Sequence, residues 1–506
     1  MRRALNADGL NLGGTPQMLA LAMLVGLSGS FVLAALATAV SPVKALIGVL
    51  GAAVAVAMML FPELAVPILC LSLPFERIGR LTDDVDTVAV SASRILGLIA
   101  LASLVLHAAL RKKKLHFELP VFLYGGYVAI GLMSNAWAWT PEETYRDGFR
   151  ILGNLLFFFL IINAVRDYAT AKRVVILWLV ASMAAGLYSL GEYYYAPQTG
   201  QISESEMGLQ STRSTTVVTD LSEARSLGGG VRRLFGTTAH PTLYGLNMTM
   251  TLPFLLWAMR TNRGLWKVLC FAGILIAAYS VFLSNTRAVL LLAAFTVVFC
   301  LLRGLWRPNL QGVLALGLLA AAVLPFIPED VYLRTLDPSL YTTSKGDSIR
   351  VRFKFWSKSW DLIGETWWHG IGNGDETTLQ KMVTDEDTGY LSTQGLKASA
   401  HNEFIWVMVE VGIFGYLCFW GFVGYVTTAA FRAATLMRRA HAGEEYLFCL
   451  ACQGLLIGIP MFAMQSEAFH YPLKAWWLVA PISCMMLRVA RERVAVQRQE
   501  LAEAVS

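Results

Sequence analysis

Charged residues are scarce in this chain of 506 residues, of which 15% are Asp, Glu, Lys or Arg and 56% are hydrophobic. Soluble domains carry about 25% charged residues, so the composition excludes an ordinary soluble protein. Runs of about 18 or more apolar residues recur along nearly the whole sequence, which is typical of a chain that crosses a membrane repeatedly. Because backbone amides in a bilayer must be satisfied within helices, we expect an all-α polytopic membrane protein.

Cysteine is absent from the long polar loops, since all seven cysteines fall in apolar segments. The sequence therefore predicts no disulfide framework. Cys449 and Cys452 form a C-x-x-C pair, but they lie inside an apolar helix and no second pair accompanies them. Packing is favoured over redox or metal chemistry there, because a buried free cysteine behaves as a small hydrophobic residue.

Several motifs of soluble and metal-dependent enzymes are also absent. The sequence holds no H-E-x-x-H spacing, no glycine-rich nucleotide loop after a strand and no G-x-S-x-G. We therefore expect no metal site and no cofactor. The formal net charge of +6 comes from basic residues in short loops on one side of the membrane, among them Arg111 to Lys114. This pattern follows the positive-inside rule and does not predict a nucleic-acid partner.

The alternation of apolar runs and basic loops predicts 12 to 14 transmembrane helices, depending on whether the short segment 63–74 crosses or is a re-entrant or tilted half-span. The connection 138–150 is expected outside, and a helix over 403–430 is expected before a basic loop at 432–443. The predicted organisation is a cytoplasmic N-terminus (1–16), N-terminal membrane helices (17–192), a first outer loop (193–239), central membrane helices (240–327), a large helical outer loop (328–401), C-terminal membrane helices (402–488) and a cytoplasmic tail (489–506).

Three basic side chains, Arg233, Arg287 and His401, are expected at the outer ends of transmembrane helices. Arginine suits bidentate binding of phosphate, so two arginines together would neutralise a diphosphate leaving group. The alternative for either arginine is a side chain that snorkels to the membrane interface. His240, directly before Pro241, is interpreted first as part of a helix start.

His401 is expected at or just before a helix N-terminus, where the helix dipole disfavours the imidazolium form. A neutral imidazole accepts a proton from a sugar hydroxyl, so His401 is the candidate base. A satisfied interfacial histidine is the alternative. Glu403 and Glu410, seven residues apart, share one face of this helix. Glu403 also stabilises a helix start, whereas Glu410 is expected in the apolar layer, where ionisable side chains are usually functional.

An aromatic and basic stretch occupies residues 350–368 of the large outer loop and includes Arg352. Asp347-Ser348 predicts the cap of a helix that begins near Ile349. Such a stretch is suited to sugar stacking or to contact with the membrane surface, and an amphipathic helix lying at the interface remains the alternative.

Four patches of the sequence together resemble the O-antigen ligase and O-antigen polymerase superfamily of bacterial envelope glycosyltransferases, over roughly residues 150 to 490. The patches are Arg233-Leu-Phe-Gly236 with His240-Pro241-Thr-Leu-Tyr-Gly245, Ser284-Asn-Thr-Arg287-Ala, Arg352…Trp356 with Gly370-Ile-Gly-Asn-Gly374, and Ala400-His401-Asn402-Glu403…Glu410-Val-Gly-Ile-Phe-Gly415. Thr242 departs from the family pattern, which often has Asn there. Extra N-terminal spans lean toward the polymerase or exopolysaccharide branch.

The resemblance implies a GT-C-like membrane protein of the bacterial inner membrane with its active site facing the periplasm. It implies a metal-independent, inverting transferase whose donor is a glycan on undecaprenyl diphosphate. In that picture Arg233 and Arg287 hold the diphosphate, and His401 activates the acceptor hydroxyl. Arg352, Glu403, Glu410 and His240 are supporting candidates.

The partners implied by the resemblance are the lipid-linked glycan, an acceptor glycan or glycolipid and membrane lipids, with a chain-length regulator or a flippase as further partners. Polymerisation of the glycan is slightly favoured. Ligation to lipid A-core or to protein is the alternative, and a membrane transporter is the alternative from another class. A transporter would show paired broken helices or internal half-repeats, and only the segment near 63–74 is short.

Overall fold

The computed structural model describes residues 42–75, 91–112, 114–138, 140–195, 234, 236–238, 241–307, 348–374, 402–466, 468–470 and 473–505. Within these ranges all the regular elements are helices, which confirms the predicted all-α class. They are α2 (Pro42–Leu60), α3 (Pro62–Ser72), α4 (Ala92–Leu110), α5 (Leu119–Met133), η1 (Ser134–Ala136), α6 (Pro141–Ala164), α7 (Tyr168–Tyr195), α10 (Pro241–Thr261), α11 (Leu265–Leu283), α12 (Arg287–Leu302), α15 (Ser348–Thr366), α18 (Glu403–Arg439), α19 (Gly443–Ala463), η5 (Ala468–His470) and α20 (Lys474–Val505).

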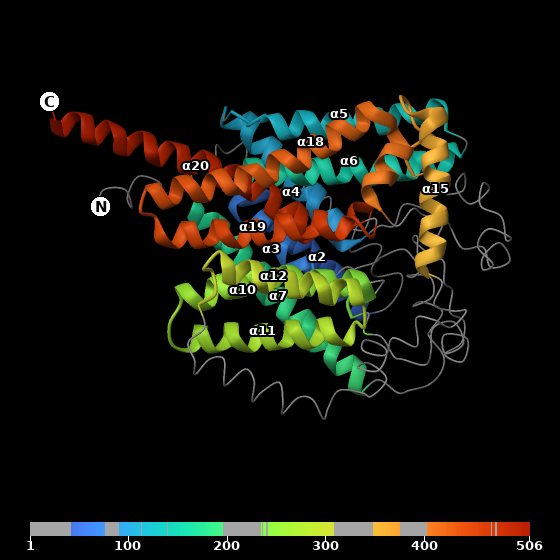
Figure 1. The fold of residues 1–506 in the computed structure, drawn as a ribbon. Coiled ribbons are helices and arrows are strands. Elements are labelled where there is room, and N and C mark those ends of the chain that lie inside the picture. Colours follow the sequence, from blue (N-terminus) through green and yellow to red (C-terminus); the bar gives the residue numbers. More distant parts are fainter. Residues whose placement is uncertain are drawn as a thin grey trace.

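Most of the helices run along a common direction as a bundle, whereas α15 lies across them at one end (Figure 1). The last part of α20 extends beyond the bundle at the opposite end (Figure 1). Helix α18 packs against α5, α19 and α20, and α10 packs against α11, α12 and α19. The centre is aromatic: Phe422 stacks on Trp477, Tyr124 packs at a tilt against both rings, and all three side chains are buried. Helix α18 is therefore the element around which the bundle is organised.

Seven of the described helices are long and apolar enough to cross a membrane. Large apolar side chains on them are exposed, for example Phe122 at 61% and Leu417 at 60%. Exposed apolar surface of this extent is expected of helices that face lipid. Together the helices define a multi-pass membrane protein. The total of 12 to 14 crossings stays a prediction, because the start of the predicted N-terminal membrane region (17–41) and the end of the central one (308–327) lie outside the described residues.

The short segment 63–74 forms α3, an 11-residue helix that contains Pro67. Only Phe61 separates α3 from α2, and the Phe61 backbone is not helical (φ −122°, ψ 83°). Helix α3 packs against α4 and α7, and Ala65, Val66, Leu69 and Cys70 are buried. A helix of this length is too short to cross a bilayer by itself, since about 20 residues are needed.

Helices extend past the edges of the apolar runs at three places. The connection 138–150 is already helical from Pro141 onward, and the predicted loop at 432–443 is helical to Arg439, so these two boundaries were wrong. The predicted tail after residue 488 continues α20 as far as Val505. The physical reason is the same in each case. Arg, Glu, Gln and Ala are good helix formers, so a helix continues past the apolar layer into polar surroundings.

Helix α18 differs from the expected continuous helix because it breaks at Gly412, whose φ of 64° and ψ of −170° are not helical. A Cβ at this position would lie 2.5 Å from the backbone carbonyl carbon of Trp368. Both the positive φ and the lack of space therefore require glycine at residue 412. The break divides α18 into a short N-terminal part, which carries Glu403 and Glu410, and a long part that ends at Arg439.

Candidate functional site

The first and second of the four sequence patches lie against each other. The backbone N–H of Leu234, the residue after Arg233, donates to the carbonyl of Leu283 at 3.0 Å. The hydroxyls of Thr242 and Thr286 are 3.5 Å apart. Thus the chain directly after Arg233 and the first turn of α10 both contact the turn between α11 and α12, which leads into Arg287.

That turn is tight because Asn285 adopts a left-handed conformation with φ of 47°. Asparagine adopts this left-handed region more readily than most residues other than glycine. Ser284 is buried and donates to the carbonyl of Val281 at 2.7 Å. Directly after this turn, Arg287 is the first residue of α12, and its side chain is partly buried at the end of the bundle.

Arg287 lies at the same end of the bundle as the start of α18. Helices α12 and α19 are antiparallel, because Gly454 lies against Phe299 and Gly458 lies against Leu292. The start of α12 is therefore near the end of α19. Beyond that end, the N–H of Phe469 in η5 donates to Glu403 Oε2 at 3.1 Å.

Asn402 caps α18, and its Oδ1 accepts from the N–H groups of Phe404 at 2.9 Å and Ile405 at 3.3 Å. The predicted helix start is thus correct. His401 directly precedes this cap in the sequence, but His401, Arg233 and His240 lie outside the described residues. The backbone of Arg352 belongs to α15, which begins at Ser348 as predicted, while its side chain is not described. The joint placement of the predicted site residues therefore stays a prediction.

The third and fourth patches also lie against each other, at the break in α18. In an unbroken helix the carbonyl of Val409 would accept from Ile413. Here it accepts from the N–H of Ile371 at 2.9 Å, and the N–H of Ile413 donates to the carbonyl of Trp367 at 2.9 Å. The segment 367–374, which follows α15, therefore satisfies the backbone groups that the break releases.

Glu410 completes this junction. Its backbone carbonyl accepts from the N–H of Gly372 at 3.0 Å, and its side-chain Oε1 accepts from the N–H of Gly374 at 2.8 Å. The side chain is fully buried. Gly370 has a φ of 72°, and a Cβ there would lie 2.3 Å from the Glu410 carbonyl oxygen. The close backbone approach explains why residue 370 is glycine, and Gly372 and Gly374 also have positive φ values of 120° and 79°.

A second group of polar side chains ties this segment to α6. Asn373 Nδ2 donates to Asp147 Oδ2 at 2.9 Å, and the same oxygen accepts from Arg150 Nη2 at 2.6 Å. Arg150 Nη1 donates to the carbonyl of Phe469 at 3.3 Å. The N–H of Asn373 donates to Ser134 Oγ at 3.0 Å. The buried network thus joins η1, α6, segment 367–374 and η5 around the start of α18.

Asp147, Arg150 and Asn373 were not among the site residues predicted from the sequence. Residues 138–150 were expected to form an outer connection, because the apolar run begins only at Ile151. A usable signal was present, since Pro141 followed by Glu142 and Glu143 is typical of the first turn of a helix. A helix that begins at Pro141 places Asp147 and Arg150 one turn apart on one face.

Cys449 and Cys452 are buried free thiols in α19. In the part of the chain that the structure describes, no three His, Cys, Asp or Glu side chains group as a metal site requires.

The fold and the described part of the site define a polytopic all-α membrane protein with a buried polar network at one end of its helical bundle. Residues 251–420, from α10 to the middle of α18, match the family model described as O-antigen ligase. Over this stretch the chain is similar to the O-antigen ligase family, and the match supports the resemblance to the ligase and polymerase superfamily. A sequence search of curated proteins finds no match to the chain.

Proposed function

We propose that the protein is an inner-membrane glycosyltransferase that extends or transfers a glycan carried on undecaprenyl diphosphate, at the periplasmic face. The observation that carries this proposal is the O-antigen ligase match over residues 251–420, which includes Arg287, Arg352, His401 and Glu410. The placement of Arg287 and of the start of α18 at one end of the bundle supports it.

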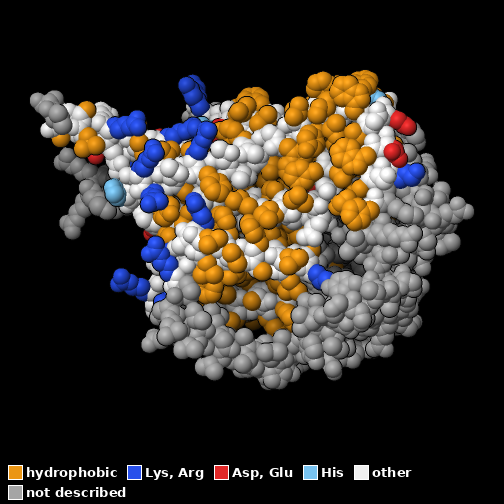
Figure 2. Space-filling view, in the orientation of Figure 1, with side chains coloured by type: hydrophobic (Ala, Val, Ile, Leu, Met, Phe, Trp, Pro, Cys, Tyr) orange, Lys and Arg blue, Asp and Glu red, His pale blue; other side chains and the backbone are white. Residues whose placement is uncertain are grey.

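The charge distribution supports the orientation. On the face shown in Figure 2, most Lys and Arg side chains gather at the end of the bundle opposite α15. Arg438 and Arg439, in the last turn of α18, are exposed there. By the positive-inside rule this end faces the cytoplasm, so the end with Arg287 and Asn402 faces the periplasm.

The proposed reaction is a direct displacement at the anomeric carbon of the donor sugar. The acceptor hydroxyl oxygen forms the new glycosidic bond as His401 takes its proton. The bond between the anomeric carbon and the phosphate oxygen breaks, and undecaprenyl diphosphate leaves with the electron pair. Arg233 and Arg287 stabilise the charge that develops on the leaving group. A single displacement of this kind inverts the anomeric configuration, and it needs no metal ion or nucleotide sugar.

Chain growth is the favoured outcome, with the next lipid-linked repeat unit as acceptor. Ligation to lipid A-core or to protein is the second candidate. The test is incubation of the purified protein in liposomes with an undecaprenyl-diphosphate-linked glycan, with and without lipid A-core. Longer chains from the donor alone support a polymerase, whereas product formed only with lipid A-core supports a ligase.

The transporter alternative makes a different prediction in the same liposomes. If the protein moves a solute across the membrane and forms no glycosidic bond from any of these donors, the glycosyltransferase assignment is wrong.

A further inference from the structure

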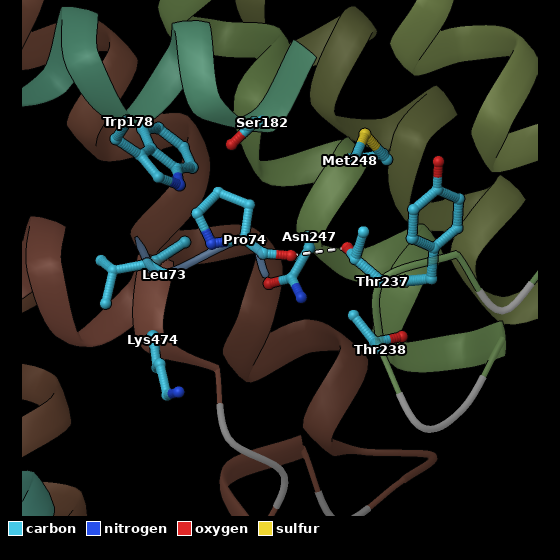
Figure 3. A pocket seen from close by; sticks show the side chains of 11 residues that line it. Leu73, Pro74, Trp178, Ser182, Thr237, Thr238, Asn247, Met248 and Lys474 are labelled. Carbon is cyan, nitrogen blue, oxygen red and sulfur yellow. Dashed lines mark hydrogen bonds between the residues drawn. The ribbon is translucent and has the colours of Figure 1, made fainter. Parts of the chain in front are cut away.

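The enclosed cavity between α3, α7 and the starts of α10 and α20 is too small for a ligand (Figure 3). Thr237, Asn247 and Lys474 are among its lining residues, and its volume is about 10 Å³. That is room for about one water molecule. A surface with several exposed aromatic side chains lies instead on α15 and directly after it.

Helix α15 has three faces of different character. One face is buried against the start of α18 and segment 367–374, where Phe355, Leu362 and Ile363 pack with Ile371, Ile405, Trp406 and Val409. A second face carries the exposed carboxylates of Asp361 and Glu365. The third carries Phe353, Trp356 and Trp360, whose spacing of three and four residues places them on one side of the helix. This third face is the aromatic stripe of α15.

The aromatic stripe is exposed. Phe353 and Trp360 are each 60% exposed, and Trp367, directly after the helix, is 53% exposed. The Phe353 and Trp356 rings contact each other edge to face, with centroids 5.2 Å apart. Contiguous exposed apolar surface of this kind marks a contact with a partner or with a membrane. The stripe therefore indicates a contact that the described helices of this chain do not supply.

Helix α18 shows where the membrane lies relative to the stripe. Its residues 413–431, between the break at Gly412 and Arg432, include no charged side chain. At about 1.5 Å per residue this stretch is ~28 Å long, close to the ~30 Å thickness of the hydrocarbon layer. Phe414 and Leu417, which follow the break, are 61% and 60% exposed, as expected of side chains that face lipid. Gly412 therefore lies at one edge of the hydrocarbon layer.

The end of α15 is fastened at the same edge. The carbonyl of Trp367 accepts from the N–H of Ile413 at 2.9 Å, and the carbonyl carbon of Trp368 would lie 2.5 Å from a Cβ at Gly412. The side chains of Trp367 and Trp368 are 53% and 56% exposed. Tryptophan is enriched at the interface between membrane and water, because its ring is apolar and its N–H is polar. These two residues therefore lie at the depth that suits them.

The end of α5 extends this group of aromatic residues. The His369 ring lies 4.4 Å from that of Trp368 and 5.9 Å from that of Trp137, which follows η1, measured between centroids. Met133, the last residue of α5, is 64% exposed. The aromatic surface at the end of α15 is thus continuous with the exposed apolar surface of α5 and α18.

The orientation of α15 fits a helix that lies on a membrane. It lies across the bundle axis (Figure 1), so it runs along the membrane plane. Asp361 and Glu365 project at about 100° and 140° around the helix from Trp360. In Figure 2 hydrophobic side chains cover the bundle as far as the α15 end, and acidic side chains lie beyond them at the outer edge. An aromatic side toward lipid and a charged side toward water are typical of an interfacial amphipathic helix.

The composition of the stripe favours lipid over a glycan as its partner. A surface that binds a polar ligand combines aromatic rings with hydrogen-bonding side chains that fix its orientation. Position 364, one turn beyond Trp360 on the same side, is glycine, and Phe353 has no polar side-chain atom. The stripe therefore offers apolar surface and indole N–H groups, which suit the headgroup region.

We propose that α15 is an interfacial helix whose aromatic stripe, together with Trp367 and Trp368, is inserted into the headgroup region of the leaflet at this end of the bundle. Apolar rings make the contact, so it requires no particular headgroup charge. Glu403 and Glu410, which precede the break at Gly412, then lie at the level of the headgroups and not in the hydrocarbon layer. The inference rests on the membrane fold alone, and it does not depend on whether the protein forms glycosidic bonds.

The test places a nitroxide spin label at residue 360 or 361 of the full-length protein in liposomes of phosphatidylcholine and phosphatidylglycerol. Trp360 and Asp361 are adjacent and both exposed, so labels on Trp360→Cys and Asp361→Cys differ in the side of α15 from which they project. EPR measures the collision rates of each label with oxygen, which partitions into lipid, and with a water-soluble nickel complex. The ratio of oxygen to nickel collisions should be about threefold or more higher at residue 360.

Two controls accompany this measurement. The unsubstituted protein, treated with the same label, gives the background from its own cysteines, of which Cys270 and Cys418 are partly exposed. Phe353→Cys, on the same stripe, replaces Trp360→Cys if that variant does not fold, and the same ratio relative to Asp361→Cys is expected.

Two results would overturn the proposal. Equal ratios at the stripe and at residue 361 would show that the stripe faces water, as a glycan-stacking surface would. A stripe label shielded from both oxygen and nickel would show that a protein surface covers α15. Glycan transfer in the same liposomes tests the proposed function separately: transfer without lipid contact leaves the enzyme assignment standing, and lipid contact without transfer leaves the assignment of α15 standing.

Discussion

Asn373 and Asp147, which are 226 positions apart in the sequence, are joined by a hydrogen bond of 2.9 Å between Asn373 Nδ2 and Asp147 Oδ2. Both side chains are buried. The bond fastens the glycine-rich segment after α15 to the first turns of α6. Because the same segment also closes the break in α18, the position of the α18 start depends on α6.

Arg150→Leu should lower the free energy of unfolding strongly. Arg150 Nη2 is 2.6 Å from Asp147 Oδ2, and the two side chains are 18% and 5% exposed. Loss of one partner leaves a buried carboxylate without its arginine, at a cost of about 3–5 kcal/mol. The measurement is unfolding in mixed detergent micelles with increasing SDS.

The control for that prediction is Lys172→Met. Lys172 pairs with Glu444 at the same distance of 2.6 Å, but the two side chains are 33% and 39% exposed. Solvent screens such a pair, so its loss should cost about 0–1 kcal/mol. Similar losses in the two variants would show that the Arg150 network does not stabilise the bundle.

Gly412→Ala should destabilise the protein and reduce any activity that depends on the α18 start. A Cβ would meet the backbone of Trp368, and φ of 64° with ψ of −170° is a region that L-residues avoid. Gly424→Ala is the matched control in the same helix, since nothing lies within 4 Å of the added Cβ. It should be neutral or stabilising by up to about 1 kcal/mol.

Thermal unfolding of the two glycine variants side by side gives the comparison. A Gly412→Ala protein as stable as Gly424→Ala would mean that the break in α18 is not a feature of the folded protein.

Glu410→Gln should be tolerated, whereas Glu410→Leu should not. The N–H of Gly374 donates to Glu410 Oε1 at 2.8 Å, and a glutamine carbonyl oxygen can accept the same bond. Leucine leaves a buried N–H without this acceptor, at a cost of about 1–3 kcal/mol. The free energies of unfolding of both variants check this. A glutamine variant as unstable as the leucine variant would point to a need for the negative charge rather than for the hydrogen bond.

The sequence predicted much of the fold because most elements are apolar runs ended by basic residues. The boundaries of α4, α11 and α12 follow such runs closely. The start of α6 and the ends of α18 and α20 did not follow hydropathy, since polar residues continue those helices. The pairing of the four patches was not predictable from spacing, because it depends on the antiparallel contact of α12 with α19 and on the break at Gly412.

Of the candidate site, the sequence predicts Arg287, Glu403 and Glu410 by residue type and position, and their roles stay predictions. It interpreted Glu410 as a functional group in the apolar layer, and the structure shows that this carboxylate accepts the Gly374 N–H. Asp147 and Arg150 were missed because their helix begins in a polar stretch.

The measurement that tests the central claim most directly is the rate of glycan transfer from an undecaprenyl-diphosphate-linked donor by Arg287→Ala, compared with Arg303→Ala. Arg303 follows the other end of α12 and is exposed there, so it serves as a matched arginine control. We predict that Arg287→Ala lowers kcat by about 100-fold or more, as expected when a group that stabilises developing charge is removed, while Arg303→Ala keeps the wild-type rate. Equal rates for both variants and the wild type would contradict the account.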